Sequence, residues 1–136
     1  MAITNAVVHD VDVAFRYEEE IAQLRILHAT LGSGVNRPFV AAQSSPQGLD
    51  VRNLLVLGPL PAEASDRWNR SVTASAFVNA PGHDYHLAPR SPAVDAGVVA
   101  GIPVDRDGTA RPQGAAPDIG AYEQADAPPT AVPARR

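Results

Sequence analysis

The chain has 136 residues, of which 45% are hydrophobic and 5% are aromatic, and its formal net charge is −4. This length fits one domain with a modest core. All eleven basic residues are arginines and they form no clustered stripe, which argues against nucleic acid as a partner. The absence of cysteine excludes disulfides and thiolate metal sites. The first residues lack the pattern of a signal peptide and no segment has the length of a membrane span, so no membrane partner is expected.

An internal repeat begins close to the N-terminus. The segments 3–8, 26–31 and 51–56 share one pattern of apolar and polar positions, and they start 23 and 25 residues apart. A period of this size is typical of solenoids, in which each unit buries its apolar face only by stacking on a neighbour. The sequence therefore predicts an all-β solenoid over residues 1–78, with two or three short strands in each coil.

One polar residue recurs at the same place in each repeat. Asn5, His28 and Asn53 align, and asparagine suits a turn because it tolerates the left-handed region and its amide bonds nearby backbone. We predict that these three residues form a structural ladder. The alternative is a catalytic or metal-binding role for His28, but no second histidine or cysteine lies at ligand spacing from it.

A second strand is predicted in the first repeat, from Asp10 to Glu18, because apolar and polar residues alternate there. The apolar face holds Phe15, and Phe39 follows 24 residues later in the next repeat. The two rings are therefore expected to stack inside the solenoid.

The outward face of this strand carries the main enzymatic hypothesis. Parallel β-helix lyases and hydrolases use acidic and basic residues on one exposed sheet for acid and base work, or to bind a cation opposite a uronate. The alternative is a solvated strand face, since the next repeat offers only Val40 and Ala42 at the stacked positions and the chain has no lysine. The weak catalytic candidates are Asp10, Asp12, Arg16 and Glu18.

The repeat decays after Gly58. Residues 59–70 are predicted to be a polar loop, and residues 71–78 one last strand. Leu60 and Trp68 are expected to anchor this loop on the side of the stack, although Trp68 also fits an exposed platform for sugar stacking. Asn69 begins a triplet that matches a glycosylation acceptor, a match that is frequent by chance.

Residues 79–124 are rich in glycine, proline and aspartate, so regular structure is expected only in short pieces there. His83 and His86 are expected to face water. Asp105 and Asp107 resemble the start of an EF-hand loop, which makes calcium a weak alternative, but the rest of that loop does not match. The carboxylates are more simply expected to accept backbone amides or to pair with arginine; this cap set is Asp95, Asp105, Asp107, Arg111, Asp118 and Glu123.

Three blocks within this segment, SPAVDAG at 91–97, DRDGTARP at 105–112 and PDIGAYE at 117–123, stand in a fixed order. They resemble the C-terminal signature of bacterial right-handed parallel β-helix proteins of the choice-of-anchor Q group. The resemblance implies two to three coils of a right-handed parallel β-helix, closed by an irregular cap at the last coil. It also implies a secreted or surface-attached protein. The tail, residues 125–136, is predicted to be disordered.

Two functions follow from these expectations. In the first, the chain is a non-catalytic module that closes a solenoid and presents a flat sheet to polysaccharide. In the second, it is a fragment of a pectate-lyase-like polysaccharide lyase or of a glycoside hydrolase. The expected partners are upstream β-helix coils or a stacked homo-oligomer, because the first strand of the stack has an exposed edge. No cofactor is expected.

Overall fold

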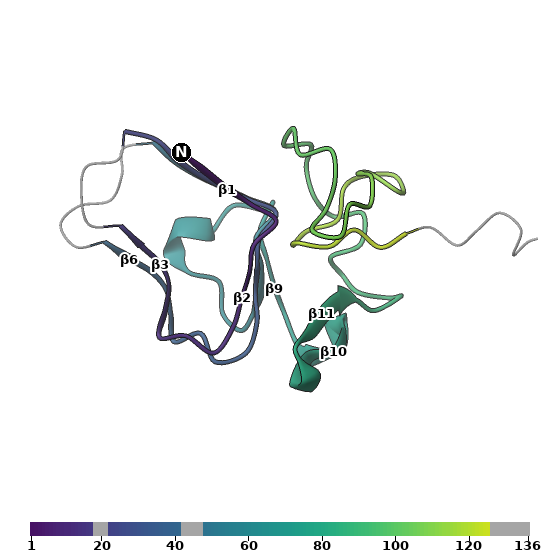
Figure 1. Cartoon of the computed structure of the whole chain (residues 1–136), viewed down its shortest axis with the longest axis horizontal. Coiled ribbons are helices and arrows are strands. Elements are labelled where there is room, and N and C mark those ends of the chain that lie inside the picture. The colour runs from purple at the N-terminus through teal and green to yellow at the C-terminus, as the bar shows by residue number, and fades with distance from the viewer. Residues whose placement is uncertain (18–21, 42–47, 126–136) are drawn as a thin grey trace, which may run out of the picture.

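The computed structural model describes residues 1–17, 22–41 and 48–125. In these residues the chain is all-β, with three short 3-10 turns and no α-helix, and most strand pairs are parallel (Figure 1). The described part contains no helix with the length and apolar character to cross a membrane.

The N-terminal half consists of parallel strands that recur in sequence and lie side by side in space. Three sheets run along the stack, with the strand orders β1-β4-β7, β2-β5-β8-β9 and β3-β6. The strands are β1 (Ala2–Thr4), β2 (Val7–Val8), β3 (Val13–Tyr17), β4 (Leu24–Leu27), β5 (Thr30–Leu31), β6 (Arg37–Ala41), β7 (Leu49–Arg52), β8 (Leu55–Leu57) and β9 (Arg70–Val72).

The register of these ladders agrees with the alignment of the repeats. Ile3 pairs with Ile26, and Ile26 pairs with Val51. Phe15 pairs with Phe39, and their ring centroids lie 5.2 Å apart, so the predicted contact between the two rings is confirmed, although their planes are tilted by 32° instead of stacked. The interior between the sheets is filled by apolar side chains from every repeat, including the fully buried Ile26.

Two predicted strands have different bounds in the structure. The strand expected from Asp10 to Glu18 begins only at Val13. Asp10 has a φ of 54°, a left-handed conformation that excludes it from an extended strand. The single strand expected over residues 71–78 is interrupted by the 3-10 turn η2 (Ala74–Ala76). Small alanine and serine side chains there supply little of the β-branched or aromatic packing that favours a strand.

The chain leaves the stack through an antiparallel hairpin. After η2, strand β10 (Phe77–Asn79) pairs with β11 (Asp84–Leu87), and the 3-10 turn η3 (Ala80–Gly82) joins them. A second hydrophobic cluster forms between this hairpin, β8 and the cap. Its buried members include Tyr85, Leu55 and Ile119.

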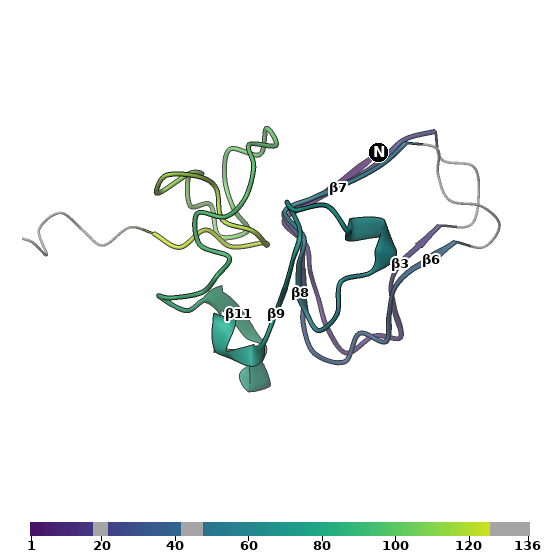
Figure 2. The same ribbon diagram turned by 180° about the vertical axis from the view of Figure 1, so that it is seen from behind.

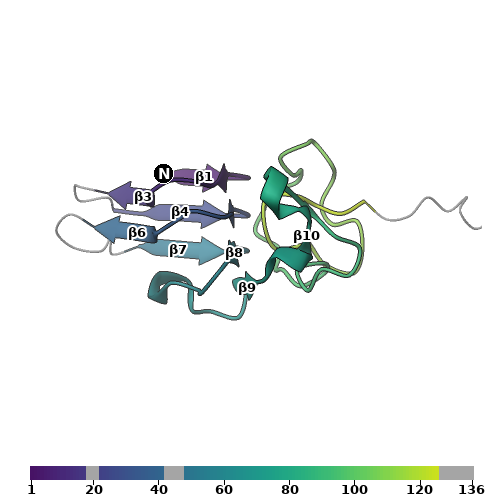
Figure 3. The same cartoon turned by 90° about the horizontal axis from the view of Figure 1, so that it is seen from below.

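The loop expected over residues 59–70 covers the end of the stack rather than its side. Its 3-10 turn η1 (Ala62–Ala64) lies across the last repeat and contacts β7 (Figures 1 and 3). Ala64 is buried in the core between the sheets, and Leu60 packs against the same core. Trp68 is half-buried, and the Arg67 guanidinium lies 4.1 Å from its ring centroid.

The cap lies along the flank of the stack. Residues 88–125 contain no named strand, and they wrap beside the strand corners of several repeats (Figures 2 and 3). The expectation that the cap closes the last coil is therefore wrong, since the loop with η1 occupies that end. The physical reason is that the cap's polar backbone needs hydrogen-bonding partners, and the strand corners along the flank offer them.

Candidate functional site

The three aligned polar residues sit at one corner of the stack, where each repeat passes from the first sheet to the second. Asn5, His28 and Asn53 have φ values of 54°, 58° and 58°, so all three occupy the left-handed region. Asparagine adopts this conformation more readily than most residues with a side chain. The corner forms a row that runs along the stack and faces the cap.

The cap binds this corner row with a different segment at each repeat. Asn5 Nδ2 donates to the Val104 carbonyl at 2.9 Å in the first repeat. In the second, the Ala121 amide donates to Thr30 Oγ1 at 2.9 Å. In the third, Asn53 Nδ2 donates to the Val98 carbonyl at 2.8 Å, and Asn53 Oδ1 accepts from the Val98 amide at 2.9 Å. Three repeats are thereby tied to one strap of chain.

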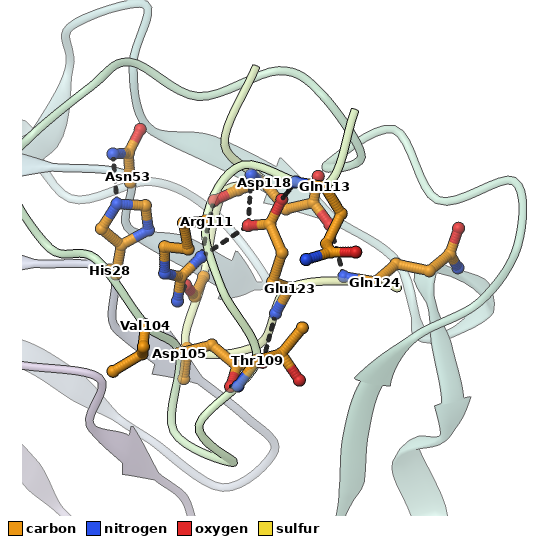
Figure 4. Close-up of polar contacts among 12 residues, drawn as sticks. His28, Asn53, Val104, Asp105, Thr109, Arg111, Gln113, Asp118, Glu123 and Gln124 are labelled. Atoms are coloured by element: carbon orange, nitrogen blue, oxygen red, sulfur yellow. Dashed lines mark hydrogen bonds and ion pairs between the residues drawn. The ribbon is translucent and has the colours of Figure 1, made fainter. Parts of the chain in front are cut away.

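His28 lies in the middle of the corner row and is 1% exposed. Because Asn53 Oδ1 accepts from Val98, its Nδ2 faces His28 Nε2 at 3.0 Å and donates to it (Figure 4). Nε2 is therefore an acceptor, which places the proton of a neutral ring on Nδ1. Burial and the positive charge of Arg111 lower the pKa of His28 to about 4, so the ring is neutral at pH 7.

A buried ion pair lies at the centre of the cap. Arg111 Nη1 donates to Glu123 Oε1 at 3.0 Å, and the two side chains are 1% and 0% exposed (Figure 4). Arg111 Nη2 reaches Asn5 Oδ1 at 3.1 Å and so joins the ion pair to the corner row. Burial lowers the pKa of the Arg111 guanidinium, while the charge of Glu123 opposes that effect.

The other buried carboxylates of the cap accept backbone amides. Asp105 Oδ1 accepts from Asp107 and Thr109, and Asp105 Oδ2 accepts from Glu123, at 2.7–2.8 Å. Both oxygens of Asp105 are therefore engaged in turning the chain. The Asp107 side chain points elsewhere, to His86 Nε2 at 2.5 Å, so the two aspartates do not converge on one cation position.

Asp118 has the same role at the other end of the cap. Its two oxygens accept the Asp95 and Gln124 amides, each at 2.7 Å. Burial raises the pKa of Asp118 to about 6, although both amides favour the charged form. Asp95 itself turns the chain with a φ of 56°.

A pocket of about 240 Å³ opens between the corner row and the cap, lined by His28, Arg111 and the segment 99–103. Among the residues that the structure describes, His28 Nδ1 and Arg111 Nε are buried nitrogens without a hydrogen-bond partner.

Three of the four weak catalytic candidates, Asp10, Asp12 and Arg16, lie in the described part of the chain, and their surroundings differ. The exposed Asp12 pairs with Arg37 and Asn36, whose hydrogen bonds lower the pKa of its carboxyl group. Asp10 has different partners, two histidines. Arg16 is exposed on β3 beside the apolar Val40, and Glu18 lies outside the described residues.

The histidine partners of Asp10 were not expected from the sequence. His9 and His83 both contact Asp10 Oδ2, at 2.9 and 3.1 Å, and they belong to segments far apart in the chain. The adjacent pair His9 and Asp10 was visible in the sequence as two ligand-type side chains. Its link to His83 could not be inferred because no repeat or motif relates the two segments.

Asn69 is buried and bonded within the stack. Its Oδ1 accepts from the Leu54 amide at 2.9 Å, and its Nδ2 donates to the Val51 carbonyl at 3.0 Å. The amide side chain that a glycosyltransferase would need is therefore engaged in the fold.

Comparisons of this chain with models of protein families, with curated proteins and with solved structures gave no match.

Proposed function

We propose that this chain is the non-catalytic C-terminal coil and cap module of a right-handed parallel β-helix protein of the choice-of-anchor Q type. The module belongs outside the cell or on its surface and turns a flat parallel sheet toward polysaccharide. The observation that carries the proposal is the strap of cap residues bound to three successive repeats through Asn5, Thr30 and Asn53. Location and fold family rest on the three sequence blocks.

The β-helix is supported by the spacing of the parallel pairs. Ile3 and Ile26 are 23 residues apart and Leu24 and Leu49 are 25 apart, and each repeat contributes to the same sheets. Left-handed corner residues at equivalent positions are the device by which such a chain turns from one sheet to the next.

A structural role for the cap is supported by the way its charged groups are used. Asp105, Asp118 and Glu123 each accept two or more hydrogen bonds from the chain itself, and Arg111 is paired. Groups held in this way organise a fold and are poorly placed to exchange protons with a substrate.

Amide hydrogen exchange tests the module. If the cap and the repeats form one unit, the amides of β4 and β8 and those of residues 118–123 will exchange with the same free energy of opening. Arg111→Ala should release the cap amides first. Cap amides that exchange independently of the strands in the unaltered protein would contradict the proposal.

A partner on the open edge of the stack belongs to the same proposal. Within the described residues β1, β2 and β3 each pair on one side only, which leaves the other edge with free backbone groups. Further β-helix coils or a second copy of the chain fit this edge. Light scattering over a range of concentrations distinguishes them, because stacking of copies raises the mass with concentration and added coils do not.

A fragment of a polysaccharide lyase or glycoside hydrolase is the alternative function. Its support is the exposure of Asp10, Asp12 and Arg16. Incubation with acidic polysaccharides separates the two functions, since a lyase yields unsaturated products and a hydrolase yields reducing ends. We expect neither, and we expect Asp12→Asn to leave polysaccharide binding unchanged. Product formation that Asp12→Asn abolishes would establish the enzyme instead.

A further inference from the structure

We propose that His9, Asp10 and His83 bind a divalent metal ion of the Zn²⁺ class. The three residues meet where the loop after β2 faces the turn that leads into β11. The site is separate from the buried Arg111–Glu123 ion pair and does not depend on the proposed function.

The spacing of the three potential ligand atoms suits a small cation. Asp10 Oδ2 lies 2.9 Å from His9 Nδ1 and 3.1 Å from His83 Nε2, and all three ligand atoms lie within 4.8 Å of one another. Ligands of a tetrahedral Zn²⁺, each about 2.0–2.2 Å from the metal, are roughly 3.3–3.5 Å apart. Rotation of these side chains, which are 34–55% exposed, would bring the three atoms to that spacing.

The backbone holds these side chains in place. Asp10 and His83 have φ values of 54° and 62°, and two left-handed residues at one cluster are a costly arrangement that the surrounding structure must maintain. The Asp10 amide donates to the Ser33 carbonyl at 2.8 Å. Gly34 completes the arrangement, because a Cβ at that position would lie 2.5 Å from Asp10 Oδ1.

The two histidine rings are aligned with each other. The His9 and His83 centroids are 4.0 Å apart and the ring planes differ by 12°. A nitrogen of each ring contacts the same carboxylate oxygen of Asp10. Because an imidazole lone pair lies in the ring plane, the two rings have to rotate out of this parallel arrangement to bind one ion. Two imidazoles and one carboxylate match the ligand preference of Zn²⁺ and neighbouring transition metals.

The buried Tyr85 contacts His83, one of the three proposed ligands, at the ring nitrogen that does not face Asp10. His83 Nδ1 lies 3.3 Å from the hydroxyl of Tyr85, a residue that is 1% exposed. That hydroxyl accepts the Ser33 amide at 2.9 Å and lies 3.1 Å from Ser33 Oγ, to which it can donate. In the metal-free chain His83 Nε2 lies at hydrogen-bond distance from Asp10 Oδ2, as a donor. With the proton kept on Nδ1 and donated to Tyr85, the ring can instead present the Nε2 lone pair to a metal ion. Outer partners of this kind orient the imidazole of a metal ligand.

His86 shows the contrasting arrangement and supplies a control. Its Nδ1 contacts Asp84 at 2.6 Å and its Nε2 contacts Asp107 at 2.5 Å, so the two carboxylates lie on opposite edges of the ring. No common point lies between the three ligand atoms. Burial acts to lower the pKa of His86, but the hydrogen bonds and charges of Asp107 and Asp84 outweigh it and the pKa is raised.

Isothermal titration of the chelator-treated whole chain with ZnCl₂ tests the site. We expect one Zn²⁺ per chain. His9→Gln and His83→Gln should each weaken binding by more than the roughly 10- to 100-fold that loss of an outer-shell partner causes. The matched variant His86→Gln should bind as the unaltered chain does. Binding of Co²⁺ should produce visible absorption of a four-coordinate ion, and His83→Gln should abolish it.

The same titration can overturn the proposal in three ways. An unaltered chain that takes up no Zn²⁺ rejects it, and so does a His9→Gln variant with unchanged affinity. Loss of binding in His86→Gln would assign the ion to another place. Circular dichroism confirms that each variant is folded; if His83→Gln is not, His9→Gln and Asp10→Asn carry the test, because both side chains are substantially exposed.

Discussion

The repeat region and the cap satisfy the hydrogen bonds of their backbone with different chemical groups. In the repeats, backbone amides and carbonyls pair with neighbouring strands, and an apolar interior around Ile26 and Leu54 supplies the stabilising burial. In the cap, backbone amides are bound by buried carboxylates, and one arginine offsets their charge. Stability of the repeats should therefore depend on side-chain volume, and stability of the cap on charge. The following substitutions separate the two.

The largest effect is expected from Arg111→Ala. This substitution leaves the Glu123 carboxylate buried without its counterion, which should lower the free energy of unfolding by about 3–5 kcal/mol. Urea denaturation followed by tryptophan fluorescence or circular dichroism measures the change. The control is Arg52→Ala, whose pair with Asp50 is partly exposed and should contribute less than about 1 kcal/mol. Equal losses in the two variants would contradict the contrast between regions.

Ile26→Ala tests the repeat region in the complementary way. Ile26 is 0% exposed and pairs with both Ile3 and Val51, so the cavity should cost about 2–5 kcal/mol, and Ile26→Val about 0.5–1.5 kcal/mol. Val99→Ala is the control, because that side chain is 73% exposed and should change stability by less than about 0.5 kcal/mol. Thermal unfolding in calorimetry gives the three values. A loss that does not scale with the volume removed would argue against a close-packed stack.

The boundary between the two regions should respond to pH through His28. The pKa of this side chain is about 4 in the folded chain and 6.5 in a model peptide, so the unfolded chain binds more protons between these values. The contribution of His28 to the free energy of unfolding is fully present above pH 6.5. It is lost as pH falls toward 4, by up to about 3 kcal/mol.

The shifted pKa of Asp118 has the opposite effect on the pH dependence of stability. The pKa of its carboxyl group is raised to about 6, so its contribution falls as pH rises from about 4 to 6. The measurement is therefore the difference in unfolding free energy between the unaltered chain and His28→Asn, a variant that retains Asp118 and suits the left-handed corner. That difference should shrink as pH falls from 6.5 to 4; a constant difference would contradict the assignment of a buried neutral ring.

Two substitutions of Asn53 separate the contribution of its side-chain hydrogen bonds from that of its left-handed backbone, and the glycine variant is expected to have the smallest effect of the series. Asn53→Gly keeps the left-handed conformation but removes the bonds to Val98 and His28, and it should cost about 1–3 kcal/mol. Asn53→Ala should cost about 1–2 kcal/mol more, because alanine is strained at a φ of 58°. Chemical denaturation of the two variants measures both steps. Equal losses of stability in Asn53→Ala and Asn53→Gly would show that the left-handed conformation of this corner does not disfavour alanine, which contradicts the prediction.

Much of the stack could be predicted because its information is local and repeated. The spacing of Ile3, Ile26 and Val51 predicts which residues pair, and the distance from Phe15 to Phe39 predicts a ring contact. The bounds of the second strand were less predictable, since alternation of polar and apolar residues continued through Asp10, where a left-handed φ ends the extended chain. Two of the catalytic candidates from that predicted strand, Asp10 and Asp12, contact different partners in the structure.

Four features could be predicted from the amino-acid sequence: the period, the all-β character, the aligned corner residues and the abundance of turn-forming carboxylates in residues 79–124. Each depends on neighbours in the chain or on a repeat of fixed length. Three features became apparent from the packing of the folded chain: η1 covers the last repeat, the cap lies along the flank, and His9 and Asp10 contact His83. Those outcomes depend on how segments without a shared period pack. They are set by long-range satisfaction of polar groups and burial of apolar surface, which no local pattern encodes.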